Sequence, residues 1–340
     1  MATSGSNDAL CAGASKAAPP SETLPSETSP LKTLPFKTLQ PETLPSKISP
    51  LKTLPSKISP LEGLDVPIHQ YKGIEDLRER VQTQTTEPQD GRSNQHCLFF
   101  RGVTKKHLAE IERERFSIRR HIRFTHYSDT GLLIIKMPSI KHEVSHRELA
   151  DTVRDVLKGM GFPKRSLVDV GSGKYFGLRS AKEGDTGYKP RVRNREADWP
   201  TIVFDSGLSE SLAQLRGDAH WWLTSSGGDV KIVVLIKIRA PQKAIVIEKW
   251  CFLPTAQIRW ATRLHPHSNA PVPTRRQEIT IRHNPAAQLS DVTSYRVTGA
   301  PLTLEFRCLL LRNPIPPEGD VILTAADLSL WACNFWTSVM

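Results

Sequence analysis

Two acidic side chains near the middle of the chain have the spacing expected of metal ligands on neighbouring strands. Asp185 lies in the segment 182–190, and Asp205 ends the apolar run 200–204. A carboxylate that ends a buried strand is costly to bury unless it is paired or bound to a metal. Glu143, on a preceding helix, is expected to complete the group, and carboxylates around Mg²⁺ or Mn²⁺ commonly hydrolyse phosphodiesters. The simpler alternative makes Asp185 a turn residue and Asp205 a helix cap.

The segment 142–146, His-Glu-Val-Ser-His, matches the zinc-protease pattern HExxH. Imidazoles four positions apart share one helix face and can hold Zn²⁺, and the glutamate between them can act as a general base. The extended form of the motif needs Gly at position 149 and His at 152, where this chain has Leu149 and Thr152. The two histidines also follow the apolar stripe of the helix, so half-buried structural histidines are the competing interpretation.

Basic residues give the chain a formal net charge of +11. Residues 1–65 contain six lysines and six acidic residues, so the whole excess falls on residues 66–340. A domain with this charge attracts polyanions, although a solubilising surface is the alternative. The basic stretch 104–122 is either a phosphate-tracking helix or a solvated one. Five basic residues near the carboxylates are expected to hold a nucleic-acid backbone, unless they form only a solvated loop: Lys182, Lys189, Arg191, Arg193 and Arg195.

The elements that must position these side chains alternate between strands and helices. Amphipathic spacing predicts a helix over 141–160, and Ser209 is a plausible N-cap for a second helix over 209–223. The β-branched run 230–238 is the strongest strand, and strand–helix–strand order predicts a mixed sheet flanked by helices. Further strands are expected at 132–137, 200–205, 244–253, 277–282, 294–298 and 302–311, and further helices at 72–83, 104–122 and 326–336.

The N-terminal part of the chain is a proline-rich repeat. Leu-Pro-Ser-Lys-Ile-Ser-Pro-Leu occurs at 44–51 and again at 54–61. Each proline removes a backbone donor and disfavours helix at the residue before it, and the repeat has too few apolar residues to form a core. We therefore expect a disordered arm that binds protein partners, if it binds any.

Cysteine usage and hydropathy bear on the compartment. The five cysteines are well separated and include no CxxC pair, so neither a disulfide framework nor a cysteine zinc site is expected. The sequence shows no basic start followed by an apolar run and no apolar stretch of about 18 residues. We expect an intracellular protein, cytoplasmic or nuclear, that is neither secreted nor membrane-bound.

Several segments of the chain carry a family resemblance. Over roughly residues 120–338 the chain resembles a large family of filamentous-fungal proteins, and that family is similar to the Uma-type bacterial members of the PD-(D/E)XK, restriction-endonuclease-like superfamily. The segments are IKMPS at 135–139, HE at 142–143, DTGYKP at 185–190, PTIVFDSGLSES at 200–211, LRGDAHWWL at 215–223, and the stretches 230–236, 309–314 and 319–321.

The resemblance implies an element order and a role for each site residue. The order is a helix with Glu, a strand with Asp, a strand ending in an acid, then a helix. Glu143 would be the helix carboxylate, Asp185 the first metal ligand and Asp205 the second. Arg216 would be the displaced cation, which can stabilise a phosphate but cannot act as a base. Mg²⁺ or Mn²⁺ would be the cofactor and nucleic acid the substrate.

The chain departs from the family pattern at three places. Gly184 stands where relatives have proline, Asp205 where they have glutamate, and no lysine follows, since Ser206 and Gly207 occupy those positions. The sequence thus predicts an α/β, restriction-endonuclease-like fold that is either a metal-dependent nuclease or an inactive binding module. The expected organisation is a disordered arm over 1–70, a basic helical segment over 71–126 and a nuclease-like domain over 127–340.

Overall fold

The computed structural model describes residues 66–86, 96–163, 166–253 and 271–339. The repeats at 44–51 and 54–61, and most of the predicted arm over 1–70, lie outside these residues.

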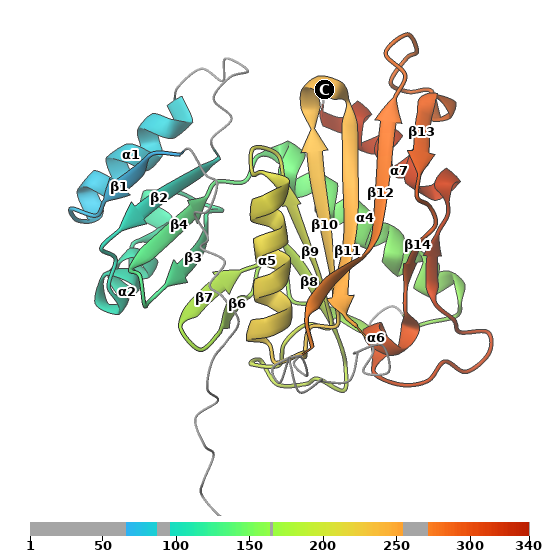
Figure 1. The fold of residues 1–340 in the computed structure, drawn as a ribbon, viewed down its shortest axis with the longest axis horizontal. Coiled ribbons are helices and arrows are strands. Elements are labelled where there is room, and N and C mark those ends of the chain that lie inside the picture. The colour runs from blue at the N-terminus through green and yellow to red at the C-terminus, as the bar shows by residue number, and fades with distance from the viewer. Residues whose placement is uncertain (1–65, 87–95, 164–165, 254–270, 340) are drawn as a thin grey trace, which may run out of the picture. The chain divides into compact units, whose positions relative to one another are not determined.

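The larger sheet in the described part of the chain has seven strands in the order β13-β12-β11-β10-β9-β8-β5 (Figure 1). The β9 and β10 strands are parallel, because a helix crosses over between them, and the other neighbours are antiparallel. The strands are β5 (Leu167–Asp169), β8 (Thr186–Pro190), β9 (Ile202–Gly207), β10 (Ile232–Arg239), β11 (Ala244–Phe252), β12 (Pro273–His283) and β13 (Tyr295–Thr298).

Helices cover both faces of this sheet, as Figure 1 shows for α5 in front of β9–β11 and for α4 and α7 behind. Alternate residues of β9 point to opposite faces: Ile202 and Phe204 join the core under α4 and α7, and Val203 joins the core under α5. The sheet is therefore buried on both sides, which explains its nearly continuous apolar strands. The helices are α4 (Ile140–Gly159), α5 (Leu212–Ser225), α6 (Phe306–Leu310) and α7 (Ala325–Val339).

A second sheet has six strands in the order β1-β2-β4-β3-β7-β6. The segment predicted to be helical over 71–126 contains three helices, α1 to α3, and also gives this sheet β2 and most of β3. The predicted boundary between 126 and 127 falls inside β3, so the structure does not separate these two regions. The elements of this part are β1 (Ile68–Gln70), α1 (Ile74–Thr86), β2 (Cys97–Arg101), α2 (Lys105–Arg113), α3 (Arg115–Ile118), β3 (Arg123–Tyr127), β4 (Leu132–Lys136), β6 (Lys174–Phe176) and β7 (Ser180–Glu183).

The chain passes from the six-stranded sheet to the seven-stranded sheet at two places that matter for the site. After β4 it enters α4, whose first turn is capped by the Ser139 hydroxyl, which accepts a hydrogen bond from the His142 N–H at 3.3 Å. After β7 it crosses through Gly184 and Asp185 into β8. The end of β4, the start of α4 and the two-residue link before β8 therefore converge.

The α/β class, with mixed sheets flanked by helices, is confirmed, and α4–β8–β9–α5 follow in the order that the resemblance implies. Two local predictions are wrong, and the helix predicted over 104–122 is confirmed for most of its length but is divided. The stretch 302–311 is a short strand, β14 (Leu302–Leu304), followed by α6, with β14 pairing to β15 (Val321–Leu323). The stretch 104–122 holds two short helices that meet at Glu114. Ser211, with Gln214, caps α5 in place of Ser209. None of the described helices is long and apolar enough to cross a bilayer.

Candidate functional site

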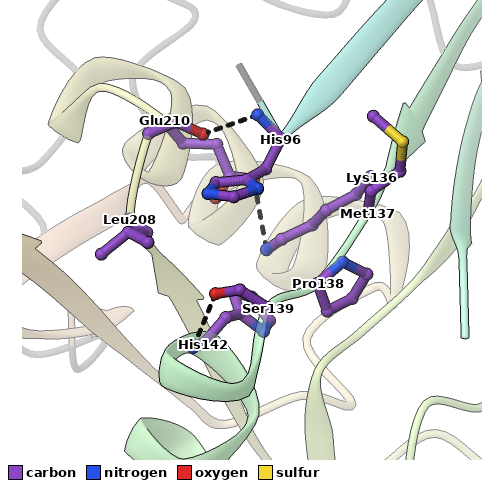
Figure 2. Close-up of a pocket in the computed structure, with 9 residues that line it drawn as sticks. His96, Lys136, Met137, Pro138, Ser139, His142, Leu208 and Glu210 are labelled. Carbon is purple, nitrogen blue, oxygen red and sulfur yellow. Dashed lines mark hydrogen bonds and ion pairs between the residues drawn. The ribbon is translucent and has the colours of Figure 1, made fainter. Parts of the chain in front are cut away.

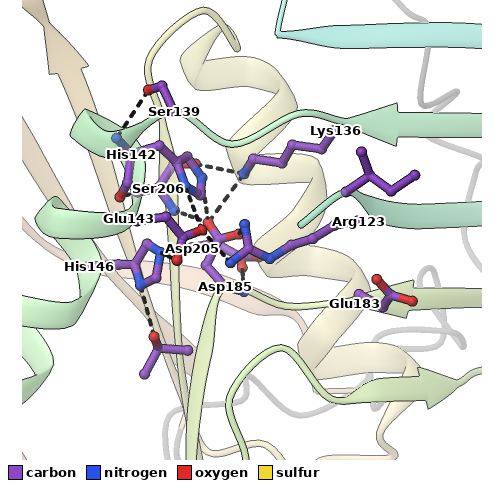
Figure 3. A network of polar contacts seen from close by, with 12 residues as sticks. Arg123, Lys136, Ser139, His142, Glu143, His146, Glu183, Asp185, Asp205 and Ser206 are labelled. Atoms are coloured by element: carbon purple, nitrogen blue, oxygen red, sulfur yellow. Dashed lines mark hydrogen bonds and ion pairs between the residues drawn. The ribbon is translucent and has the colours of Figure 1, made fainter. Parts of the chain in front are cut away.

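Asp185 is the centre of a buried polar network (Figure 3), with 3% of its surface exposed. Lys136 Nζ lies 3.2 Å and His142 Nε2 lies 2.9 Å from Oδ2 of Asp185. Arg123 Nη1 lies 3.3 Å from Oδ1, and the Ser206 backbone N–H donates to Oδ2 over 2.8 Å. Burial favours the neutral carboxyl, but the neighbouring imidazole, ammonium and guanidinium groups outweigh it and hold the pKa of Asp185 well below its usual range.

Glu143, in the first turn of α4, is linked to Asp185 through a shared guanidinium. Arg123 Nη2 lies 2.6 Å from Oε1 of Glu143, while its Nη1 faces Asp185. The exposed Arg147 binds the other oxygen, with Nη2 2.9 Å from Oε2. Burial opposes ionisation, but the two nearby imidazoles and Arg123 outweigh it, so the pKa of Glu143 is lowered. Both carboxylates are thus anionic and share one cation.

Asp205 is joined to the network through the backbone of Asp185. Its Oδ1 accepts the Asp185 N–H at 3.2 Å, and its Oδ2 accepts the Trp222 indole N–H at 2.7 Å. The Lys182 ammonium lies 4.0 Å from Oδ2, and burial raises the pKa of Asp205. Asp205 therefore fixes the link before β8 in place, and its oxygens already accept hydrogen bonds from protein donors.

The sequence reasoning missed Arg123 and Lys136, which are the cations nearest to the acidic group. Lys136 is a charged residue at the end of the apolar strand β4. Asp205 is likewise a charged residue in an apolar strand, β9. The argument that a charge on a buried strand needs a partner applies equally to a lysine, so this signal was available. Burial lowers the pKa of Lys136, but the adjacent carboxylates, of which Asp185 has the largest effect, raise it by more. The ammonium of Lys136 therefore stays protonated.

Arg216, the predicted displaced cation, makes its contacts elsewhere. It binds the buried Glu248 on β11, with Nε 3.0 Å from Oε2, and Arg275 Nη1 lies 3.0 Å from Oε1 of the same carboxylate. In the strand register, Asp205 and Glu248 both pair with Leu235 of β10, so they are two strands apart, roughly 10 Å. Arg216 therefore belongs to a separate ion-pair group on the α5 face, and Lys136 stands beside Asp185 instead.

The five basic residues expected on a nucleic-acid surface differ in how far they are exposed. Lys182 and Lys189 are buried, with 6% of each exposed, so a phosphate backbone does not reach them in this structure. Lys182 Nζ lies 2.9 Å from Asp218. Arg193 clamps its own loop, since it donates to the Trp199 carbonyl at 2.7 Å and to Asp229 at 2.9 Å. The two that are exposed are Arg191 and Arg195.

Gly184 stands where the family pattern has proline, and the packing around it explains the glycine. The same packing predicts an effect of substitution on stability. A Cβ at Gly184 would lie 2.9 Å from Cζ2 of Trp222, which is fully buried. Gly184→Ala is therefore expected to destabilise the fold by about 1–3 kcal/mol, because the indole cannot move away. Gly217→Ala is the matched control: its Cβ would meet nothing within 4 Å on α5, so about 0.5–1 kcal/mol of stabilisation is expected. Urea unfolding checks both, and equal stability of the two variants would contradict the argument.

A small pocket adjoins the network (Figure 2), where Lys136 and His142 line its wall and also contact Asp185. Glu210, on the opposite wall, lies 3.2 Å from Lys136 Nζ. The pocket is lined by His96, Lys136, Met137, Pro138, Ser139, His142, Leu208, Ser209 and Glu210.

Three buried side chains in the network have the donor set of a cation site. His142, His146 and Asp185 each offer one ligand atom, and these atoms lie within 4.8 Å of one another. His142 Nδ1 and His146 Nε2 are buried and have no hydrogen-bond partner. Buried polar atoms normally have partners, so these two nitrogens are available as ligands, and the donor types suit a divalent metal. The predicted half-buried histidines are in fact buried.

Comparison with known proteins adds little beyond this geometry. The sequence matches no family model, and it matches no curated protein. Among solved structures it is similar to a protein from Anabaena variabilis described as a "putative nuclease belonging to DUF820", with 13% identity and a TM-score of 0.32. The match covers 62% of this chain and 90% of that one. A TM-score of this size is too low to support a functional comparison, so the chemistry of the site is inferred from its own contacts.

Proposed function

We propose that this chain is a divalent-metal-dependent hydrolase of nucleic-acid phosphodiesters. The observation that supports it is the meeting of three acids from the expected elements: Glu143 from α4, Asp185 before β8 and Asp205 on β9. Arg123 joins the first two, and a backbone hydrogen bond joins the last two. The order helix, strand, strand is the order that the resemblance implies for a nuclease site.

The residues would divide the work between holding a metal and receiving a phosphate. Asp185 and Glu143, with the adjacent imidazoles, would hold the ion, and Asp205 would position Asp185. A bound divalent ion lowers the pKa of a coordinated water and neutralises phosphate charge. Lys136, protonated and facing the pocket, would bind the scissile phosphate and stabilise its added negative charge in the transition state. It would take the place of the missing lysine after Asp205.

Cleavage assays test this proposal. The full chain is incubated with labelled single- and double-stranded DNA and RNA, with Mg²⁺ or Mn²⁺, beside Asp185→Asn and Lys136→Met. We expect metal-dependent cleavage that falls by about 100-fold or more in both variants, because each removes a group that acts on the phosphate or its metal. Asp155→Asn, on the exposed face of α4, should cleave as the wild type does. Absence of metal-dependent cleavage on all four substrates, or full activity in Asp185→Asn, would exclude the proposal.

A binding module without catalysis is the second candidate, and one observation favours it. Arg123 and Lys136 already neutralise Asp185 and Glu143, so the acids are satisfied without a metal. If the chain is such a module, it should bind nucleic acid both in the presence of EDTA and after the substitution Asp185→Asn. Fluorescence anisotropy measures this binding. A zinc protease is not favoured, because its metal needs an open position facing a peptide cleft, whereas His142 and His146 are buried here.

A further inference from the structure

We propose that His142 Nδ1, His146 Nε2 and the carboxylate of Glu143 bind one divalent transition-metal ion of the Zn²⁺ class, with Asp185 beside it. The inference deepens the proposed function, because it concerns the same site and names the metal that the site selects. It differs from the HExxH arrangement of proteases, in which the glutamate between the histidines is a base and not a ligand. It also differs from a site of carboxylates alone, which suits Mg²⁺.

The surroundings of His142 determine which of its ring nitrogens carries the proton. Nε2 lies 3.0 Å from the Ser206 carbonyl oxygen and 2.9 Å from Asp185 Oδ2, and both of these atoms are acceptors. Nε2 must therefore be the donor, which leaves the lone pair of the neutral ring on Nδ1. Nδ1 is buried without a hydrogen-bond partner, 3.7 Å from Oε1 of Glu143. A metal-bound imidazole commonly donates its other N–H to a carboxylate or carbonyl in this way.

His146, one helical turn later, presents its other ring nitrogen to the same carboxylate. Its Nδ1 lies 2.8 Å from the Thr186 hydroxyl, whose oxygen can accept a hydrogen bond from the N–H of that nitrogen. Its Nε2 is then the lone-pair nitrogen; it is buried, has no hydrogen-bond partner and lies 3.7 Å from Oε2 of Glu143. His146 is completely buried. Both imidazoles are thus held by a partner on one side and aimed at Glu143 on the other.

The separation of each imidazole nitrogen from its nearest Glu143 oxygen suits two ligands of one ion better than a hydrogen bond. A distance of 3.7 Å is too long for an N–H···O bond between Glu143 and either imidazole. Two atoms that each lie ~2.1 Å from a common metal are separated by roughly 3–4 Å. Arg123 and Arg147 already contact the two oxygens of Glu143, and a metal ion between this carboxylate and the two nitrogens would remove the remaining repulsion between the lone pairs and the anion. Asp185, which lies 2.9 Å from the other nitrogen of His142, stands beside this set and orients that ring.

The donor types determine which metal is preferred. Two imidazoles with one or two carboxylates are a nitrogen–oxygen set that favours Zn²⁺ and its neighbours in the first transition row. Mg²⁺ prefers oxygen ligands, keeps several waters and requires octahedral geometry, which this buried set does not offer. We therefore expect Zn²⁺ or Co²⁺ to bind at one ion per chain, on the order of 100-fold or more tighter than Mg²⁺.

Calorimetric titration of the EDTA-treated full chain with Zn²⁺, Co²⁺ and Mg²⁺ tests the inference, and the visible spectrum of bound Co²⁺ reports its ligands. His146→Gln removes one ligand and should weaken Zn²⁺ and Co²⁺ binding by roughly 100-fold or more. Thr186→Val keeps both imidazoles but removes the acceptor behind His146, so a loss of about 10–100-fold is expected. His220→Gln, on α5, is the matched control and should bind as the wild type does. Circular dichroism confirms that each variant is folded.

The outcomes separate the inference from the proposed function. One bound Zn²⁺ or Co²⁺ per chain, weakened in His146→Gln, supports the inference even if no substrate is cleaved, and cleavage alone then decides the proposed function. Cleavage that needs Mg²⁺, in a chain that binds neither Zn²⁺ nor Co²⁺, would uphold the proposed function and overturn the inference. Zn²⁺ binding that is unchanged in His146→Gln would place the ion elsewhere and overturn it as well.

Discussion

Replacement of Asp185 by alanine is expected to lower the free energy of unfolding by about 3–5 kcal/mol, because it removes the buried anion that two cationic side chains and one imidazole N–H of the network share. Arg123, Lys136 and the imidazole of His142 all lie within 3.3 Å of its carboxylate. The Ser206 N–H also loses its acceptor. Arg123 keeps Glu143 and Lys136 keeps Glu210, but each loses one of its anionic partners in the interior, so the loss greatly exceeds that of a surface ion pair.

Urea unfolding at neutral pH measures this loss, with Asp155→Ala as the control for removing an aspartate from an exposed position of α4. The control should change stability by no more than about 0.5 kcal/mol. Asp185→Ala and Arg123→Ala should not be additive, since each removes one side of the same pair, and a double-mutant cycle should show this coupling. A loss below about 1 kcal/mol in Asp185→Ala would mean that water replaces the carboxylate and that the network is not buried in solution.

Replacement of Lys182 by methionine is also expected to cost about 3–5 kcal/mol, although the sequence suggested a surface role for this lysine. Its ammonium lies 2.9 Å from Asp218 and 4.0 Å from Asp205, and 6% of the residue is exposed. Burial raises the pKa of both aspartates, and Lys182 is the cation that opposes this shift. Without Lys182, the carboxyls of Asp205 and Asp218 would have less positive charge near them. The folded state would therefore lose stability at neutral pH.

Thermal unfolding at pH 7 checks this result, and Lys158→Met, at an exposed position of α4, is the matched substitution. A surface lysine that only contacts phosphate would behave as Lys158 does, with a change in stability near zero. If Lys182→Met is as stable as the wild type but weakens nucleic-acid binding, the original surface interpretation is correct and the burial seen here does not hold in solution.

The parts of the fold that the sequence predicts are those that local patterns encode. The helix that becomes α4 and the strand that becomes β10 have strong periodicity or β-branched composition, and both are found within two residues of their predicted bounds. The strands β2 and β3 were missed because Cys97–Arg101 and Arg123–Tyr127 are short and adjoin a charged stretch. Their strand conformation comes from pairing with β4, which is a tertiary effect.

Within the candidate site, too, the sequence predicts the residues with a local signal and not those placed by tertiary contacts. Glu143, Asp185 and Asp205 could be named because a carboxylate in an apolar context is visible in the sequence, and the resemblance supplied their order. Arg123 and Lys136 could not be matched with them, because the pairing depends on the crossing from one sheet to the other. The ion pair of Lys136 with Asp185 spans 49 residues of sequence, and no local pattern encodes such a contact.

The division of the site between two sheets has a consequence for how such a protein can evolve. The acids are carried by α4 and the seven-stranded sheet, whereas Arg123 and Lys136 are carried by β3 and β4 of the six-stranded sheet. A recombination event that exchanged the N-terminal sheet for another module would leave Asp185 and Glu143 without their cations. A descendant that lost this sheet would have to acquire new cations, or a permanently bound metal, at the same time. The charge balance of the site therefore depends on both sheets, and neither is an accessory to the other.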